Sequence, residues 1–168
     1  RLDELIDRFK SELVQYQSKS YADSYENKIT NVRGTLGADK ALLKDYARNL
    51  YKLMAYKDEY EIARLYSHSG FRTQLESQFE GDFQLRYHLA PPLLSKNGPN
   101  GRPEKIEFGS WMRYAFALLA KFKLLRGTPF DPFGYLAERK TERSLISEYD
   151  DLIQHLANEY HEFSPSQR

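Results

Sequence analysis

The stretch DKALLKDYARNLYKLM, residues 39–54, decides the fold, because its apolar side chains return with the period of an α-helix. Leu43, Tyr46, Leu50 and Met54 recur at intervals of three or four residues. This spacing places them on one side of a helix, and most of the residues between them are charged or polar. The stretch is therefore predicted to form an amphipathic helix.

The residues before this stretch repeat the same pattern twice. Apolar side chains recur with helical spacing at Leu2, Leu5, Ile6, Phe9, Leu13 and Tyr16, and again at Tyr21, Tyr25, Ile29 and Val32. Gly34 and Gly37 interrupt the second run. Two amphipathic helices are therefore expected to open the chain.

Two shorter helices are predicted after residue 54. Asp58 and Glu61 have a spacing close to that of a capping box, so a helix is expected to start there. A further short helix is predicted around Leu75, with Gly81 as its C-terminal end. Ser69 is expected to cap its N-terminus, because serine side chains accept from free backbone N–H groups.

The period changes to two between Phe83 and Leu89, where apolar and polar residues alternate as in a half-buried strand. Asn-Gly pairs, which favour turns, follow this segment. Ile106 and Phe108 are suited to a short returning strand. A small β-hairpin insertion is thus predicted near residues 83–108.

The stretch from Trp111 to Leu125 is apolar on more than one face, so its helix is expected to run through the core and to end at Gly127. A loop rich in proline and aromatic residues, 128–134, leads to a long last helix. The expected inner face of that helix consists of Leu145, Ile146, Tyr149, Leu152, Ile153, Leu156 and Tyr160.

Together these elements predict a mainly α fold class, a multi-helix single domain with one small hairpin insertion. The domain is expected to cover residues 1–163, with residues 164–168 as a disordered tail. The first residue is Arg1, and an amphipathic pattern is already running at Leu2. We therefore interpret the chain as a fragment of a larger protein.

Composition excludes several kinds of chemistry. The chain has no cysteine, which rules out disulfides, thiolate-bound clusters, a cysteine nucleophile and cysteine-type zinc sites within these residues. Its 25 basic and 24 acidic residues give a net charge of +1, so no global field attracts nucleic acid or anionic lipid. No window approaches the roughly 20 apolar residues of a membrane span, and no leader pattern is present. We expect no nucleic-acid or membrane partner and a cytoplasmic location.

No complete catalytic, nucleotide or metal site is recognised in the sequence. His155 and His161 lie six residues apart, which does not place two ligands on one helical face. His68 stands between two serines, but sequence neighbours rarely form a catalytic triad. The acidic clusters at 58–61 and 148–151 are expected on solvated helix faces or first turns. We therefore predict no catalytic residue and no metal ligand.

Basic side chains cluster around the predicted hairpin. They are Arg86, His88, Lys96, Arg102 and Lys105, with Tyr87 and Phe108 among them. Such a group could form an anion-binding surface. Exposed lysine and arginine more often only solvate a loop, so both interpretations stay open.

Three long runs resemble one known family. They are ARNLYKLMAYKDEYEIARLY, residues 47–66, FEGDFQLRYHLAPPLL, residues 79–94, and FGSWMRYAFALLAKFKLLRGTPFDPFGYLAERKTER, residues 108–143. Each resembles the C-terminal domain of bacterial indolepyruvate ferredoxin oxidoreductase, the fused form of the 2-oxoacid:ferredoxin oxidoreductases. The resemblance covers about Tyr21 to Tyr160 and is weaker across residues 31–40.

The resemblance implies a parent enzyme that oxidatively decarboxylates arylpyruvates to acyl-coenzyme A and passes the electrons to ferredoxin. It also implies thiamine diphosphate, Mg2+, iron–sulfur clusters and coenzyme A, held by other domains of the family. Here the pair Gly81-Asp82 is followed by Phe83 instead of the rest of a thiamine diphosphate motif, and the cluster cysteines are missing. No catalytic residue and no cofactor is therefore assigned to this chain.

In that context we expect a non-catalytic accessory domain that packs against the catalytic domains of the same polypeptide, or against a partner subunit. Aromatic loops stiffened by proline lose little entropy on docking, so the contact is expected near Leu93, Trp111, Phe130 and Phe133. In the other interpretation these loops fold back on their own domain, with Asp131 capping a turn. The alternative function is a module that binds coenzyme A or another anion through the basic hairpin.

Overall fold

The computed structural model describes residues 1–37, 39–81, 83–91, 95–96 and 98–160. These residues form seven α-helices, one 3-10 turn and a two-stranded antiparallel sheet, so the predicted mainly α fold class with a small hairpin is confirmed. Contacts divide the chain into a first unit, Arg1–Asp58 with Lys123–Arg168, and a second unit, Glu59–Phe122. Each unit is described by itself. The predicted tail, residues 164–168, lies outside the described residues.

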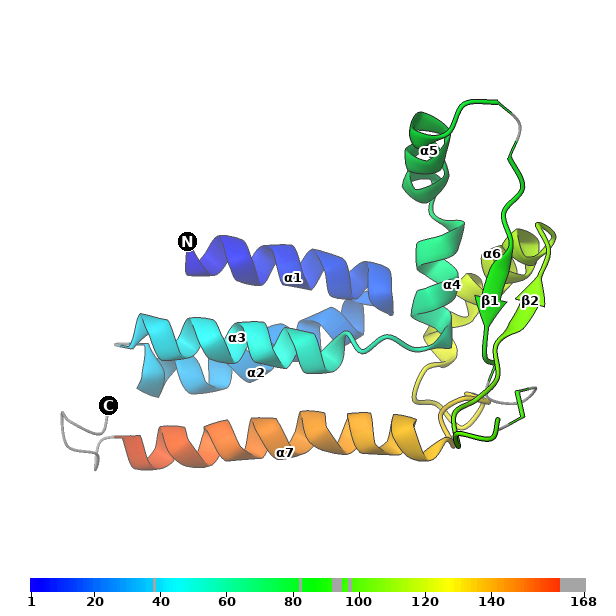
Figure 1. Ribbon diagram of the computed structural model, residues 1–168. Helices are drawn as coiled ribbons and strands as arrows, with labels where there is room; N and C mark the ends of the chain where they lie inside the picture. Colours follow the sequence, from blue (N-terminus) through cyan, green and yellow to red (C-terminus); the bar gives the residue numbers. More distant parts are fainter. Residues whose placement is uncertain (38, 82, 92–94, 97, 161–168) are drawn as a thin grey trace. The chain divides into compact units, whose positions relative to one another are not determined.

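The first unit is built from four helices. They are α1 (Leu2–Tyr16), α2 (Lys19–Leu36), α3 (Lys40–Met54) and α7 (Ala137–Glu159). All four lie where the sequence pattern predicts a helix. Figure 1 shows them lying side by side, and α3 contacts each of the other three. Ser18 and Asp39 cap α2 and α3, because their side-chain oxygens accept from backbone N–H groups of the first turn.

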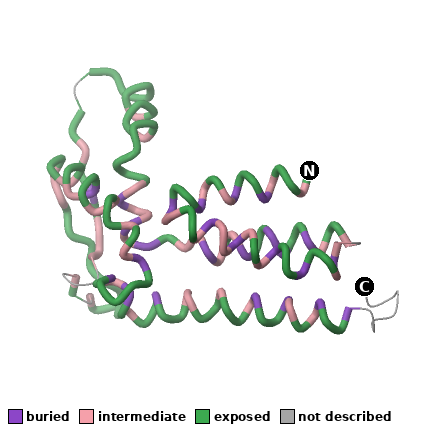
Figure 2. Tube along the Cα trace, turned by 180° about the vertical axis from the view of Figure 1, so that it is seen from behind, coloured by how far each residue is buried: buried purple, intermediate pink, exposed green. Residues whose placement is uncertain are grey.

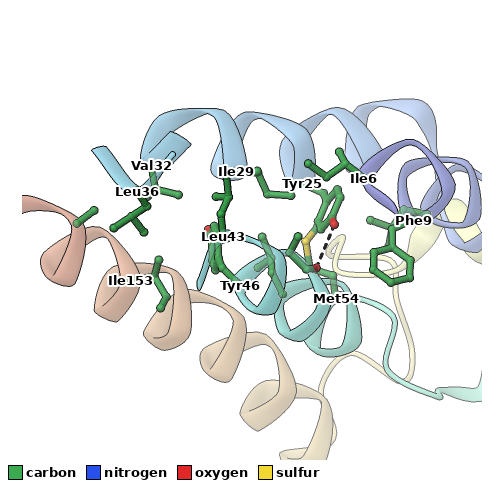
Figure 3. Close-up of a cluster of buried hydrophobic side chains, with 14 of the residues drawn as sticks. Ile6, Phe9, Tyr25, Ile29, Val32, Leu36, Leu43, Tyr46, Met54 and Ile153 are labelled. Carbon is green, nitrogen blue, oxygen red and sulfur yellow. Dashed lines mark hydrogen bonds between the residues drawn. The ribbon is translucent and has the colours of Figure 1, made fainter. Parts of the chain in front are cut away.

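Each helix buries one face in a shared core. In Figure 2 the buried positions recur at intervals along these helices, with exposed residues between them. Figure 3 shows the core side chains meeting between the helices. The core contains Ile6, Phe9, Leu13, Tyr16, Ala22, Tyr25, Ile29, Val32, Leu36, Leu43, Tyr46, Ala47, Leu50, Met54, Ile153, Ala157 and Tyr160.

Tyrosines supply a large part of this core and link the helices through their hydroxyl groups. The Tyr25 hydroxyl donates to the carbonyl of Ala47 at 3.0 Å, the dashed line beside Tyr25 in Figure 3. The Tyr21 hydroxyl donates to the carbonyl of Met54 at 2.9 Å. Both rings come from α2 and both acceptors lie on α3. The two helices are therefore held in register by hydrogen bonds that also satisfy buried polar groups.

Helix α7 buries a narrower face than predicted. Ile153 and Tyr160 are buried as expected, but Leu145 is 43% exposed and Leu152 is 61% exposed. The two leucines lie seven residues apart, at the outer edge of a face centred on Ile153 and Ala157. The prediction was wrong for these leucines because the predicted face covered too wide an arc.

No helix in the described ranges combines the length and the apolar surface needed to cross a bilayer.

Asp150 takes an inner position on α7 and is only 4% exposed. Its carboxylate accepts a hydrogen bond from the Tyr46 hydroxyl at 2.6 Å and pairs with Lys28. Gln154 also donates to it at 3.0 Å. The expectation that residues 148–151 form a solvated acidic face is therefore wrong for Asp150, which joins α2, α3 and α7.

The second unit contains three helices and the sheet. They are α4 (Glu59–Ser67), α5 (Ser69–Gln78), β1 (Tyr87–Leu89), β2 (Ile106–Phe108) and α6 (Met112–Lys121), and a 3-10 turn, Phe122–Leu125, follows directly. Helices α4 and α6 pack on each other. A small core forms where Ala63 of α4, Tyr87 of β1 and Phe116 of α6 meet.

The hairpin is shorter than predicted. The register pairs Tyr87 with Phe108 and Leu89 with Ile106, and residues 83–86 are not in the sheet. The alternating pattern from Phe83 onward suggested a longer strand. A strand needs a partner along its length, and β2 supplies one for three residues only.

Helix α4 begins directly after Asp58, as predicted, whereas the cap of α5 differs. The residue preceding α5 is His68, and its Nδ1 accepts from the N–H of Gly70 at 3.1 Å. Ser69, the predicted cap, is the first helical residue instead. Helix α5 has no buried residue, so it contributes little to the core of its unit.

Candidate docking surface

Helix α6 carries apolar side chains on two faces, and one of these faces packs inside the second unit. On this inner face Phe116 is buried against Ala63, and Met112 and Leu119 pack beside them. The ring of Phe116 also makes an edge contact with Tyr87, with 5.3 Å between the ring centroids. The inner face therefore attaches α6 to α4 and β1.

The outer face carries four large apolar side chains that remain exposed. Their exposed fractions are 58% for Trp111, 65% for Tyr114, 57% for Leu118 and 47% for Phe122. They follow one another at intervals of three or four residues and so form one line along the helix, which we call the α6 stripe. The expectation that this helix runs through the core is wrong for this face. Clustered exposed apolar side chains are typical of an interaction surface.

Basic side chains flank the α6 stripe. Arg113 and Lys121 are exposed, and the sequence has no acidic residue between Glu107 and Asp131. The guanidinium of Arg113 lies 4.5 Å from the centre of the Tyr114 ring, a cation–π contact. The surface is therefore apolar and positively charged. It is complementary to an apolar partner surface with an acidic rim.

The residues predicted to dock are divided between the units. Trp111 belongs to the second unit and lies on the α6 stripe, whereas Phe130 and Phe133 belong to the first unit. Phe130 is 81% exposed and Phe133 is half-buried. Leu93 lies outside the described residues. The four residues predicted to dock therefore do not form a single site within the residues that the structure describes.

Three members of the α6 stripe were not predicted as docking residues, namely Tyr114, Leu118 and Phe122. Leu118 and Phe122 were expected in the core, because a helix that is apolar all round is usually buried, and Tyr114 was not singled out. The sequence signal that could have identified them is their spacing of three or four residues, counted from Trp111. This spacing places them on the same side of the helix as Trp111 and on a different side from Phe116. The tertiary structure was needed to decide which of the two faces is covered.

In the loop between Gly127 and Gly134, Asp131 caps a turn, as one of the two interpretations expects. Asp131 is buried, and its carboxylate accepts from the N–H of Gly127 at 2.8 Å and of Phe133 at 3.1 Å. Gly134 is required because a Cβ atom there would lie 2.7 Å from the Oδ2 atom of Asp131. Asp131 thus organises the loop from inside and leaves Phe130 at its surface.

A buried ion pair joins Arg126 to Asp58 in the first unit. The Nη2 atom of Arg126 donates to one carboxylate oxygen of Asp58 at 2.8 Å, and Nε donates to the other. The Nη1 atom donates to the carbonyl of Tyr16 at 2.6 Å, and the guanidinium lies 3.7 Å from the centre of the Tyr16 ring. Asp58 was expected as a helix cap within a solvated acidic cluster at 58–61, and the solvated position is wrong for Asp58, which is buried. No local pattern could indicate its pairing with a residue so distant in the chain.

The segment that carries Arg126 also closes the C-terminal end of α1. The Lys123 ammonium donates to the carbonyls of Val14 and Gln15, at 3.2 and 2.6 Å. Gln17 donates in return to the carbonyl of Arg126 at 3.3 Å. Lys123 and Arg126 thus both bind the C-terminal end of α1. Their N–H groups donate to carbonyls that have no partner within the helix, and their positive charges interact favourably with the helix dipole.

The tyrosines next to this pair have raised pKa values. Burial raises the pKa of Tyr16 far above its ordinary value, and the negative charge of Asp58 raises it further, while Arg126 opposes the shift. Burial likewise raises the pKa of Tyr21. Because the two opposite charges are enclosed and paired, this cluster is a structural element of the first unit.

The residues predicted as an anion patch lie at or near the hairpin, and all are exposed. They are Arg86, His88, Lys96, Arg102 and Lys105. A carboxylate lies among them, since Glu107 faces His88 across the sheet and pairs with Arg86. The Nε2 atom of His88 is 3.8 Å from the same carboxylate. Glu107 therefore neutralises part of the patch.

Two members of the patch are brought together by backbone hydrogen bonds. The N–H of Glu104 donates to the carbonyl of Lys96 at 2.9 Å, and the N–H of Gly98 donates to the carbonyl of Arg102 at 2.9 Å. These bonds close the loop, so that Lys96 and Arg102 lie on adjacent segments.

The histidines are spread over both units. His68 caps α5, His88 faces solvent on β1, and His155 lies 3.3 Å from Glu159 one turn further along α7. His161 is outside the described residues. Among the residues that the structure describes, no group of three or more His, Asp or Glu side chains is arranged to hold a metal ion.

These features define a mainly helical protein with a small hairpin and one exposed aromatic helix face. The chain belongs to a family of unknown function, DUF6537, whose model matches residues 2–167. No curated protein matches the chain, and no solved structure matches it. The family assignment by itself supplies no activity.

Proposed function

We propose that this chain is a non-catalytic accessory domain that docks through the α6 stripe onto the catalytic domains of the same polypeptide, or onto a partner subunit. Its role is to hold their relative geometry. The parent is a cytoplasmic indolepyruvate (2-oxoacid):ferredoxin oxidoreductase, with thiamine diphosphate, Mg2+, iron–sulfur clusters and coenzyme A in its other domains. The parent assignment rests on the resemblance of the three runs, and the docking role rests on the α6 stripe.

The exposure of the α6 stripe is the observation that supports docking. Complete burial of one large apolar side chain is worth about 1.5–3 kcal/mol. Covering Trp111, Tyr114, Leu118 and Phe122 together would therefore stabilise a complex by several kcal/mol before the entropic cost of association. Trp and Tyr are also enriched among the residues that dominate interface energies.

The charges beside the stripe define the partner more closely. Arg113 and Lys121 flank the apolar residues, and the neighbouring sequence contains no acidic residue to neutralise them. Carboxylates at the rim of a partner surface would form ion pairs with both cations. The apolar centre of that surface would then contact the rings of the α6 stripe. The proposed contact on the catalytic domains or subunit is such a surface.

Substitutions in the parent protein test the docking role. We expect the double substitution Trp111→Ser and Leu118→Ser to weaken assembly in size-exclusion chromatography and to lower turnover. Leu152→Ser is the matched control, because Leu152 is similarly exposed but lies on α7. The control should change neither assembly nor turnover.

Two results would contradict this role. One is a double variant that assembles and turns over like the unmodified parent. The other is a loss of thermal stability in the chain alone as large as that caused by Phe116→Ala, a substitution in the small core. In that case the α6 stripe is packed within the chain and is not available to a partner.

The parent assignment has its own test. The purified parent should reduce ferredoxin when supplied with an arylpyruvate and coenzyme A, and the reduction should require both. Failure with every arylpyruvate tried, in a preparation that contains its cofactors, would contradict the assignment. This result is independent of the α6 stripe.

A second candidate function is the binding of coenzyme A or another anion by the hairpin. The observation that favours it is the closed loop, which brings Lys96 and Arg102 together. Glu107 supplies a sharp test because its negative charge opposes an anion at Arg86 and His88. Glu107→Gln should tighten coenzyme A binding, and Arg102→Gln should weaken it, as measured by the rise in melting temperature. The absence of any rise with millimolar coenzyme A would exclude this function.

A further inference from the structure

The second unit contains a hollow whose lining includes Arg113 and Tyr114, two residues that also belong to or flank the α6 stripe. It has a volume of about 770 Å³ and lies between helix α5, residues 83–87 and the beginning of α6. Sites for small molecules commonly have volumes of about 300–1,000 Å³. The hollow is therefore large enough for a ligand of one or two rings.

Aromatic rings form much of its wall. Tyr66 makes edge contacts with Phe71 and Tyr87, with 5.2 and 5.5 Å between ring centroids. Tyr66 also stacks on Phe116 of the small core at 5.3 Å, which holds its ring in place. Phe83 lines the same hollow and is partly exposed. Rings that are already held by one another can receive a flat apolar ligand with little loss of entropy.

Arg113 brings a positive charge to this wall. Its guanidinium lies over the Tyr114 ring and donates to the Tyr114 hydroxyl, and no described carboxylate pairs with it. Burial raises the pKa of Tyr87, and the positive charge of Arg113 partly opposes that shift, as expected of a guanidinium close to the ring. Arg72, the other arginine of the wall, is already paired with Glu76 at 2.6 Å. The charge of Arg113 is therefore available to an anion.

His68 adds a hydrogen-bond donor to the hollow. Its Nδ1 atom accepts from the N–H of Gly70, so the hydrogen of a neutral ring is on Nε2. An acidic group bound in this hollow would therefore have a guanidinium and an imidazole N–H among the side chains of the wall. Both are common partners of carboxylate and phosphate oxygens.

We infer that this hollow binds a small aromatic anion, a flat ring system that carries one carboxylate or phosphate group. The ring contacts Phe71, Phe83 and Tyr87, and the anionic group pairs with Arg113. This inference does not depend on the identity of the parent, and the hollow shares Arg113 with the surface that flanks the α6 stripe.

Calorimetric titration of the chain with 2-naphthoate tests the inference, with 2-naphthyl phosphate as a second arm. Saturable binding of at least one of these two probes is expected. The probe that binds more tightly shows whether the site prefers a carboxylate or a phosphate group. 2-Naphthamide, which keeps the rings but lacks the charge, should bind about ten-fold more weakly. Phe83→Ala should weaken all three probes, because it removes a ring from the wall.

Arg113→Gln separates specific binding from adsorption to apolar surface. We expect it to weaken binding of the anionic probes about ten-fold and to leave the amide unaffected, whereas Arg113→Lys should retain part of the affinity. Arg86→Gln is the matched control, because Arg86 is an exposed arginine of the same unit outside the hollow. Circular dichroism establishes that each variant is folded. No saturable binding of either anion, or equal affinity in the Arg113→Gln and Arg86→Gln variants, would overturn the inference.

Discussion

Arg126 and Asp58 form a bidentate ion pair although 68 residues separate them in the chain, and the two side chains are almost completely enclosed. The same guanidinium holds the last carbonyl of α1 through Tyr16. The pair therefore connects the end of the first helix, the residue before α4 and the segment that precedes α7. A cluster of this kind stabilises the fold only as long as both partners are present.

Arg126→Met is expected to lower the free energy of unfolding by about 3–5 kcal/mol, because it leaves the carboxylate of Asp58 buried without its cation. Urea unfolding followed by circular dichroism measures the change. Arg72→Met is the control, since the Arg72–Glu76 pair is exposed and should cost less than about 1 kcal/mol. Equal effects of the two substitutions would show that the Arg126–Asp58 pair does not stabilise the fold.

Asp150 and Asp151 are adjacent but differ in burial. Asp150→Ala removes the acceptor of the Tyr46 hydroxyl and the partner of Lys28, so it should cost about 1–3 kcal/mol of stability. Asp151 is exposed, and Asp151→Ala should change stability by no more than about 0.5 kcal/mol. The comparison needs only the unfolding midpoints in urea. A larger effect at Asp151 would mean that the inner face of α7 is assigned wrongly.

Two glycines should respond to alanine with opposite signs. At Gly134 the new Cβ atom would meet the carboxylate of Asp131 at 2.7 Å, so Gly134→Ala is expected to cost about 1–3 kcal/mol. At Gly34, inside α2, no atom lies within 4 Å of the position, so Gly34→Ala should stabilise by about 0.5–1 kcal/mol. Differential scanning calorimetry gives both shifts. Stabilisation by Gly134→Ala would contradict the packing of the 127–134 loop.

Alkaline pH should unfold the first unit. Burial raises the pKa values of Tyr16, Tyr21, Tyr25 and Tyr46, and at Tyr46 the hydrogen bond to Asp150 adds to the shift. The unfolded chain therefore loses these protons first, with pKa values of about 10. The stability they provide is complete below that pH and is lost as the pH rises above it.

The measurement is a pH titration that follows helical circular dichroism and tyrosinate absorbance in the same samples. A step in absorbance should coincide with loss of helix, because the buried hydroxyls ionise only on unfolding. Tyr25→Phe should make that step smaller by one tyrosine. If all the tyrosines ionise while the helical signal is unchanged, the buried positions of these rings are wrong.

Local sequence patterns determined most of the helices. The run from Leu43 to Met54 repeats with the helical period, and α3 buries those residues. Helical period and turn residues act over a few positions, so they are visible without a structure. The same is true of the basic residues at the hairpin, whose exposure follows from their charge and their position near turns.

Only the tertiary structure decided which partners these elements meet. The alternating pattern from Phe83 to Leu89 became a strand only where Ile106–Phe108 lies opposite it. Asp58 and Asp150 resemble surface acids in sequence, but each meets its cation or hydroxyl only after distant helices pack. Helix α6 has two apolar faces, and the position of α4 determines which one is buried and leaves the α6 stripe exposed. Periodicity reports the preference of a side chain for burial, whereas burial itself depends on what the fold brings against it.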